Sequence, residues 1–334
     1  MTERTADFRA RLIRCTGLSN SAINAAWPDW WSDAAEASPS AQAELRFSLA
    51  RTLGLDPRSL LGDEEPRFIW DDSAKFKGFS GDPSAERPVI ASFGTALARM
   101  LLQATPTVSI GHSPAAADLR NYILRTRPHV GLIELLATSW SLGIPVIHLR
   151  VYPLSAKRMS AMSVRIGDRY AILLARDAIY PASLAFHLAH ELGHIFLHHL
   201  TDGQAIVDFD EVIGSTATAD TEEGAADAYA LEVLTGRPAI DLQVEGGGRG
   251  ARQLAAEAIR VGAKEHIEPG TIALAYGYAT KHWNTANAAL GHIYERPYDA
   301  WVAVNKVAKG HLRLDALPDE SESYVRAVMG ALHG

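Results

Sequence analysis

Apolar residues recur at the spacing of a helix that buries one face through most of the chain. In residues 41–53, for example, Leu45, Leu49 and Leu53 fall on one stripe, and Gly54 follows as a stop. The same periodicity predicts further helices over residues 89–105, 115–126, 130–142, 181–200, 221–234, 251–263, 271–290 and 321–332. We therefore expect a mostly helical protein.

Three short segments near the middle of the chain break this pattern and predict strands. Residues 144–151 are apolar and β-branched, and Pro145 favours a strand start or a sheet edge. Residues 162–166 and 169–174 flank Gly167-Asp168, which is typical of a hairpin turn. A small antiparallel sheet followed by the helix of 181–200 indicates an α+β fold. An edge strand at 144–151 could also bind an extended peptide as an additional strand.

Composition divides the chain into four predicted parts. Residues 1–62 are helical, and LARTLGLDPRSLLG within them resembles the closing helices of helix-turn-helix modules. The stretch where a recognition helix should lie is acidic and rich in tryptophan, which favours a degenerate docking module over a DNA reader. Residues 63–88 combine Pro, Gly and charge, as in a linker or a strapped-down extended segment. Residues 89–240 hold the strands and the central helix, and residues 251–334 form a C-terminal helical domain.

The central helix carries the candidate chemistry, the HExxH motif His190-Glu191-Leu192-Gly193-His194. The two histidines project from one helix face, one turn apart, which is the spacing that two imidazoles need to share one metal ion. Glu191 stands beside the first of them, where its carboxylate can hold a water molecule without binding the metal.

The rest of the helix fits a half-buried position. Leu184, Leu188, Leu192 and Ile195 form an apolar stripe that can pack on the sheet, and the small Gly193 permits a close neighbouring backbone. A solvated stripe of histidines is the alternative, because three more lie on the same segment: His187, His198 and His199.

A catalytic zinc site keeps three protein ligands and an open position, so one more ligand is needed. Glu223 and Asp227 lie four residues apart on the helix predicted at 221–234 and therefore share a face. Glu223 can reach the metal, while Asp227 can accept the ring N–H of a ligating histidine. Glu223 can equally serve as a helix N-terminal charge. The other downstream carboxylates considered are Asp208, Asp210, Glu211, Asp220 and Glu222.

These two segments together resemble a known family. HELGHIFLH (190–198) with EGAADAYA (223–230) is similar to the motif pair of the ImmA/IrrE zinc metallopeptidases, over roughly residues 130–240. The resemblance implies a zincin-like core, Zn2+ held by His190, His194 and Glu223, and Glu191 as the catalytic base. It places Asp227 against a ligating histidine. His198 matches the extended motif, as a further site residue or as a structural helix end.

The chain departs from the family pattern at one position. Ala225 stands where the family usually has an acidic residue. This side chain is not needed for the metal, so the predicted zinc site is unaffected.

Composition narrows the functions that are compatible with the chain. The 334 residues carry a formal net charge of −7, which argues against a generally basic protein that coats nucleic acid. Cys15 is the single cysteine, which excludes an internal disulfide and a cysteine-rich zinc ribbon. We expect Cys15 to be a packed core residue rather than an inhibitory zinc ligand. With no apolar leader or membrane-length apolar run in the sequence, the expected location is the cytoplasm.

The leading hypothesis is a cytoplasmic zinc endopeptidase of narrow specificity. By resemblance, its partner is a protein substrate such as a helix-turn-helix repressor, cleaved in a stress, mobile-element or phage response. The flanking helical domains would restrain it or sense a signal. The alternative is a non-proteolytic regulatory or antitoxin-like protein that retains zinc for folding, and a third reading is a DNA-binding regulator using residues 1–62. Residues considered for stabilising the oxyanion are His112, His148, Tyr170 and Tyr276.

Overall fold

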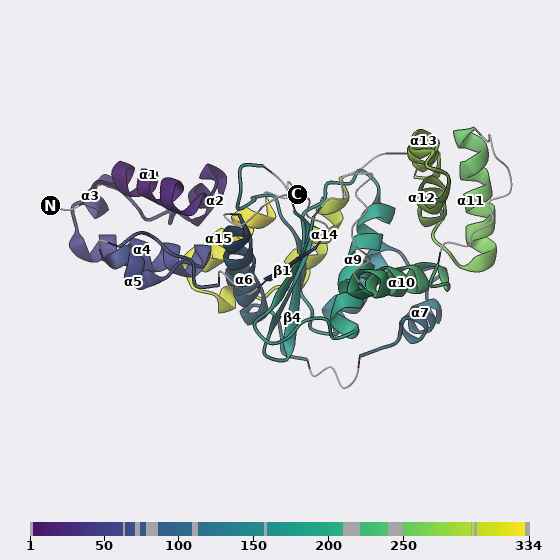
Figure 1. Ribbon diagram of the computed structural model, residues 1–334, viewed down its shortest axis with the longest axis horizontal. Coiled ribbons are helices and arrows are strands. Elements are labelled where there is room, and N and C mark those ends of the chain that lie inside the picture. The colour runs from purple at the N-terminus through teal and green to yellow at the C-terminus, as the bar shows by residue number, and fades with distance from the viewer. Residues whose placement is uncertain are drawn as a thin grey trace.

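The computed structural model describes residues 3–62, 64–70, 74–77, 86–108, 113–156, 159–209, 221–239, 250–294, 296 and 299–330. In these residues the chain forms an elongated, mostly helical α+β molecule around one five-stranded sheet (Figure 1). The strands are β1 (Ala74–Lys77), β2 (Val146–His148), β3 (Met159–Ile166), β4 (Arg169–Leu174) and β5 (Ala205–Phe209). The helices are α1 (Thr5–Thr16), α2 (Asn20–Ala26), α3 (Asp33–Glu36), α4 (Pro39–Leu53), α5 (Pro57–Leu61), α6 (Arg87–Gln103), α7 (Ala116–Leu124), α8 (Leu132–Ser141), α9 (Pro181–Phe196), α10 (Thr221–Thr235), α11 (Ala251–Glu265), α12 (Pro269–Thr280), α13 (Trp283–Ile293), α14 (Ala300–His311), the 3-10 turn η1 (Leu314–Ala316) and α15 (Asp319–Met329).

The sheet is mixed, which corrects the prediction of a small antiparallel sheet. Its strand order is β1-β5-β3-β4-β2. The predicted hairpin forms the antiparallel pair β3–β4, and Gly167 takes the positive φ of +65° that its turn requires. Both edge strands, β1 and β2, instead run parallel to their neighbours. Parallel pairs need long connections, which a reading of adjacent segments does not reveal.

Two of these strands lie where no strand was predicted. β1 falls within residues 63–88, which were interpreted as a linker or extended segment, and β5 falls within the loop expected after the central helix. Both strands are short, and β1 has alternating lysines rather than a hydrophobic run. Their pairing with each other and with β3 supplies the stability that their local sequence does not signal.

Helices cover both faces of the sheet. Alternate strand residues point to opposite sides, so Met162 and Leu173 enter one core, while Ile172 and Leu174 enter the other. The first core includes α6 and the second includes α9 (Figure 1). The central helix therefore packs on the sheet as its apolar stripe predicts.

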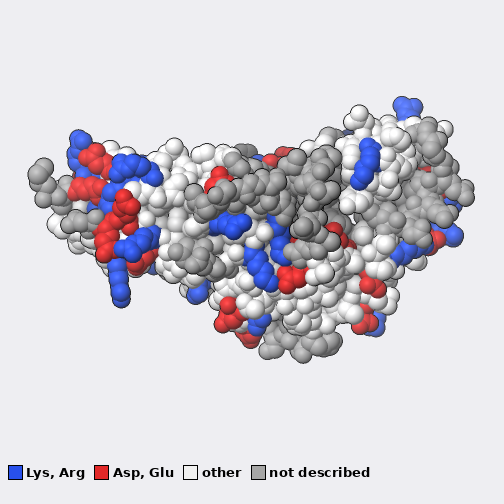
Figure 2. All heavy atoms as spheres, in the orientation of Figure 1, with Lys and Arg blue, Asp and Glu red and all other residues white. Residues whose placement is uncertain are grey.

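The N-terminal helices form a compact group against α6 and α15 at one end of the molecule (Figure 1). Side-chain hydroxyls cap several of them, as at Ser19, whose Oγ accepts from the Ala22 N–H. The position of a recognition helix holds only the four-residue α3. On the face shown in Figure 2, acidic and basic side chains are intermixed over this end.

The last third of the chain occupies two places. Helices α11, α12 and α13 pack together at the far end of the molecule, whereas α14 and α15 return to the sheet and to the N-terminal helices (Figure 1). The single helix predicted over 271–290 is wrong: α12 ends at a left-handed Lys281 with φ of 62°, and α13 folds back on it. Gly277 lets the two helices approach, because a Cβ there would lie 2.8 Å from that of Ala286. The four predicted domains remain a prediction.

None of the described helices combines the length and apolar character that crossing a bilayer requires.

Candidate metal centre

Helix α9 presents the HExxH motif from a buried position. It begins with Pro181 at its first turn, where a missing N–H carries no penalty. The predicted apolar stripe is almost wholly inaccessible to solvent: Leu184, Leu188, Leu192 and Ile195. His190, Glu191 and His194 are buried as well, so the alternative of a solvated histidine stripe is wrong for these residues. Three buried ionisable groups on one helix need partners from other elements.

Helix α10 supplies the first partners because it crosses α9 closely at Gly193. A Cβ at Gly193 would lie 3.1 Å from both the Cα and the carbonyl oxygen of Ala226. This contact confirms that the small residue admits a neighbouring backbone. It also brings the face of α10 that bears Glu223 and Asp227 over the two histidines.

The facing side chains form a tight group. The Nε2 atoms of His190 and His194 are 3.0 Å apart. Glu223 lies across both, with Oε2 at 3.4 Å from Nε2 of His190 and Oε1 at 3.4 Å from Nε2 of His194. The sequence-predicted trio of His190, His194 and Glu223 is therefore assembled in one place.

Asp208 joins this group from strand β5, a position that the predicted ligand set did not include. Its Oδ2 lies 3.2 Å from Nε2 of His190. All four side chains offer ligand atoms within 4.8 Å of one another. Asp208 reaches the site because it alternates with Val207 and so shares the face of Ile206, which packs in the core of α9. The apolar run AIVDF (205–209) contains a single carboxylate, Asp208. That carboxylate can be recognised as a site residue only once the run is known to be a strand.

Hydrogen bonds on the far side of each imidazole orient the histidines. Nδ1 of His190 lies 2.9 Å from Oδ1 of Asp227, the contact predicted from the sequence. Nδ1 of His194 lies 2.9 Å from Nδ1 of His199. Because a carboxylate can only accept here, Nδ1 of His190 carries the proton that it donates, and Nε2 is directed at the cluster.

Glu191 is fully buried beside the cluster but is not one of the four grouped ligands. Ser163 on β3 donates a hydrogen bond to its Oε2. Burial raises the pKa of Glu191 well above its usual value, and the negative charge of Asp208 raises it further. Ser163 was not identified from the sequence.

The pKa values of the two histidines are shifted in opposite directions. Burial alone would lower the pKa of His190, but hydrogen bonds to Asp208, Asp227 and Glu223 outweigh it and raise that pKa well above the usual value. Burial lowers the pKa of His194 to about 3, and the neighbouring charge of His190 acts in the same direction. Burial would likewise raise the pKa of Asp208, but its hydrogen bond with His190 lowers it. In the metal-free protein, His190 therefore holds the proton of the pair.

The residues fit a divalent metal ion on two independent observations. Four tetrahedral ligands at about 2.0–2.1 Å from an ion are separated from one another by about 3.3–3.4 Å. Four of the distances between donor atoms here run from 3.0 to 3.4 Å, two of them to different oxygens of Glu223, and one donor atom from each residue lies within 4.8 Å of the others. Three buried carboxylate oxygens also lack a hydrogen-bond partner among the described residues: Glu191 Oε1, Asp208 Oδ1 and Glu223 Oε1. Two imidazoles and two carboxylates suit zinc, and also manganese or iron.

The remaining residues considered from the sequence lie outside this group. His198 has a left-handed backbone with φ of 60°, and its Nε2 contacts Ser113, consistent with a helix-end position. His148 is buried with both ring nitrogens on backbone carbonyls. Cys15 is half-buried on α1. His112 lies outside the described residues.

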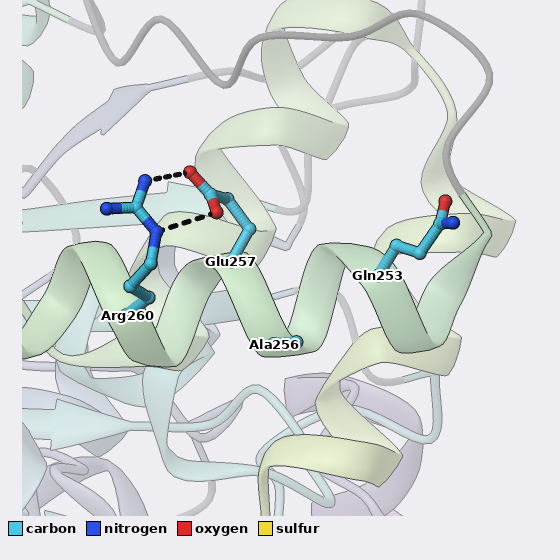
Figure 3. Close-up of a pocket in the computed structure, with 4 residues that line it drawn as sticks. All are labelled: Gln253, Ala256, Glu257 and Arg260. Atoms are coloured by element: carbon cyan, nitrogen blue, oxygen red, sulfur yellow. Dashed lines mark hydrogen bonds and ion pairs between the residues drawn. The ribbon is translucent and has the colours of Figure 1, made fainter.

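A shallow hollow of about 440 Å³ lies elsewhere, over Gln253, Ala256, Glu257 and Arg260 of α11. Figure 3 shows that all four residues belong to this one helix and that Arg260 pairs with Glu257. The residues that line this hollow are not part of the metal cluster.

Comparisons of the chain with protein-family models, with curated proteins and with solved structures find no match. The structural finding is a buried cluster that is consistent with an HExxH metal centre: His190, His194, Asp208 and Glu223.

Proposed function

We propose that this protein is a zinc-dependent endopeptidase of the ImmA/IrrE type, with a zincin-like catalytic core. His190, His194 and Glu223 would hold the ion. When bound, Zn2+ acts as a Lewis acid that polarises a peptide carbonyl and makes water more acidic. The motif pair on α9 and α10 and the grouping of these three side chains support the proposal.

The observation that carries the proposal is the placement of Glu191. Its carboxylate is buried against the cluster, with Oε2 fixed by Ser163 and Oε1 without a hydrogen-bond partner in the described residues. A structural metal site has no use for such a group. In a hydrolase, Oε1 accepts the proton of the attacking water and passes it to the nitrogen of the leaving amine. Burial raises the pKa of Glu191 well above its usual value, which makes its carboxylate a stronger base.

Asp227 and Ser163 would act as positioning residues. Asp227 keeps the proton of His190 on Nδ1, which leaves Nε2 free to ligate. Ser163 holds the Glu191 carboxylate in one orientation, so that a single oxygen is available for proton transfer. Both contacts come from outside α9, which ties the reactive geometry to α10 and to the sheet.

We further propose that the substrate is a protein, such as a helix-turn-helix repressor, cleaved in response to stress, a mobile element or a phage. Such a substrate implies a cytoplasmic enzyme. The N-terminal helices, a degenerate helix-turn-helix-like module in this reading, would dock a partner or sense a signal rather than read DNA. Peptide binding along residues 144–151 is not part of the proposal, because Asn305 hydrogen-bonds both the N–H and the C=O of His148 in β2.

A non-proteolytic regulator with a structural metal is the second candidate, and Asp208 favours it. Structural zinc sites have four protein ligands, and Asp208 supplies a fourth candidate ligand, a carboxylate 3.2 Å from Nε2 of His190. The retained, non-ligating Glu191 favours the peptidase.

The deciding experiment incubates the purified protein, with Zn2+ or with a chelator, against the repressor encoded beside its gene. The peptidase proposal expects a discrete fragment with the wild type and Zn2+, and none with chelator or with Glu191→Gln. Glu191→Gln should retain its zinc, which separates loss of the base from loss of the site. Equal zinc content with no cleavage of any neighbour-encoded protein would favour the structural reading.

A further inference from the structure

Asp208 occupies a rigid position in the fold. Strand β5 lies between β1 and β3, and Asp208 pairs in register with Lys77 on one side and Ala161 on the other. Its backbone is thereby held by two ladders, whereas Glu223 and Asp227 lie on the more exposed helix α10. A carboxylate placed this firmly at 3.2 Å from His190 Nε2 is a built feature of the site.

A neighbouring carboxylate shows what a non-ligating acid looks like here. Glu222 faces the two lysines of β1, with its carboxylate oxygens 3.1–3.3 Å from Nζ of Lys75 and Lys77. Asp208, in contrast, pairs with His190 and also interacts with the buried Glu191, and its Oδ1 has no hydrogen-bond partner among the described residues. A buried carboxylate left in this state calls for a cation.

We propose that Asp208 is a fourth metal ligand and that its carboxylate closes, in this arrangement, the position that a hydrolytic site keeps open. The inference rests on the proposed function, which requires one position for water or substrate. With Asp208 engaged, His190, His194 and Glu223 leave no open tetrahedral position. The structure is then the resting form of the enzyme.

The fourth coordination position opens when the side chain of Asp208 moves away from the metal. Because β5 is paired on both edges, rotation of the side chain away from His190 opens the site without breaking either ladder. An open position then becomes available while the three remaining ligands hold the ion. Removal of the Asp208 carboxylate should therefore have two opposite effects: weaker metal binding and greater access of water to the metal.

The test uses the full-length, metal-free protein and Co2+ alone as the probe. Visible absorption reports coordination number, because four-coordinate Co2+ absorbs more strongly than five- or six-coordinate Co2+. Wild type, Asp208→Ala and Asp208→Asn are titrated beside Asp118→Asn, a surface control on α7, and His194→Ala. Mn2+ with water-proton relaxation then counts rapidly exchanging water on the metal in each protein.

We expect wild type and Asp118→Asn to bind one Co2+ with a strong four-coordinate spectrum and to give little water relaxation with Mn2+. Both Asp208 variants should still bind one ion, with affinity weaker by about tenfold or more, and should gain exchangeable water. Asp208→Asn preserves the shape of the residue, so it answers the question even where Asp208→Ala does not fold.

Spectra, affinities and water access that are identical in wild type and Asp208→Asn would overturn the role of Asp208 while leaving the three-ligand site intact. Failure of the wild type to bind any ion, or binding that persists in His194→Ala, would overturn the metal site and, with it, the proposed function.

Discussion

Two buried polar networks lie beside the same sheet, and they differ in completeness. At β2, Asn305 accepts from the N–H of His148 at 2.7 Å and donates to the carbonyls of His148 and Met329 at 2.8 and 2.7 Å. At the α9–α10–β5 cluster, by contrast, three buried carboxylate oxygens have no hydrogen-bond partner among the described residues.

This difference in hydrogen bonding distinguishes a network that stabilises the fold from one that binds a ligand. A buried polar network that satisfies its own groups stabilises the fold and needs nothing from outside. One that leaves buried carboxylate oxygens without hydrogen bonds around two imidazole nitrogens can be completed by a cation. The Asn305 network should therefore matter equally with and without metal, whereas the cluster should contribute fully only when metal is bound.

The largest effect is expected at Asn305. Asn305→Ala leaves three buried backbone groups without partners and should lower the free energy of unfolding by about 4 kcal/mol. Denaturant unfolding measures this loss, with the exposed Asn287→Ala as the control. The loss should be the same in Zn2+ and in chelator. A loss that disappears on metal binding would erase the distinction between the two networks.

Metal binding comes next. Zn2+ at a hundred times its dissociation constant should raise the free energy of unfolding by about 2.7 kcal/mol. The raised pKa of His190 stabilises the metal-free protein below the usual histidine pKa, and this contribution is lost as pH rises through the raised value. Metal binding must displace the proton from Nε2 of His190. The stabilisation by Zn2+ should therefore increase as pH rises from the usual histidine pKa through the raised pKa of His190. Thermal unfolding across pH, with and without Zn2+, measures it. A gain that shrinks with rising pH would contradict the assignment.

The contact between α9 and α10 gives a smaller effect. Gly193→Ala places a methyl group 3.1 Å from the Ala226 backbone, so the helices must separate, at a cost of about 1–3 kcal/mol. Metal affinity should fall as well, because Glu223 moves with α10. Gly224→Ala is the matched control: its Cβ meets no atom within 4 Å, and it should stabilise α10 slightly. Equal behaviour of the two variants would show that the close approach does not position Glu223.

The smallest effect concerns Lys77, whose positively charged side chain lies beside the cluster. Lys77 Nζ lies 3.8 Å from Oε1 of Glu223 and repels a metal ion in the site. Lys77→Met should therefore tighten Zn2+ binding a few-fold, equivalent to about 0.5–1 kcal/mol. Lys75→Met is the control, because Lys75 and Lys77 both pair with Glu222, whereas the ion pair with Glu223 comes from Lys77. Competition with a zinc indicator measures both, and weaker binding in Lys77→Met would indicate that Lys77 supports Glu223 instead.

Helix periodicity and the motif spacing predicted much of this molecule. The positions of α6, α7, α8, α9 and α10 follow from apolar stripes and stop signals, and the β3–β4 hairpin follows from its Gly-Asp turn. His190, His194, Glu223 and Asp227 were placed together because helical spacing fixes which side chains share a face.

The remainder depends on contacts between distant parts of the chain. β1 is four residues of alternating lysine, stabilised by pairing with β5 across a separation that no local pattern encodes. Asp208 enters the cluster only because β5 is a strand, and Ser163 reaches Glu191 only because β3 lies beneath α9. The break at Lys281 was missed because a left-handed lysine has no distinctive sequence signal.

The most direct measurement of the central claim is the metal content of the folded chain by native mass spectrometry. We expect one Zn2+ per wild-type chain and none in His190→Ala or His194→Ala. His187→Ala, on the same helix but outside the cluster, should retain one ion. Absence of zinc from the wild type, or its retention in both cluster variants, would contradict the account.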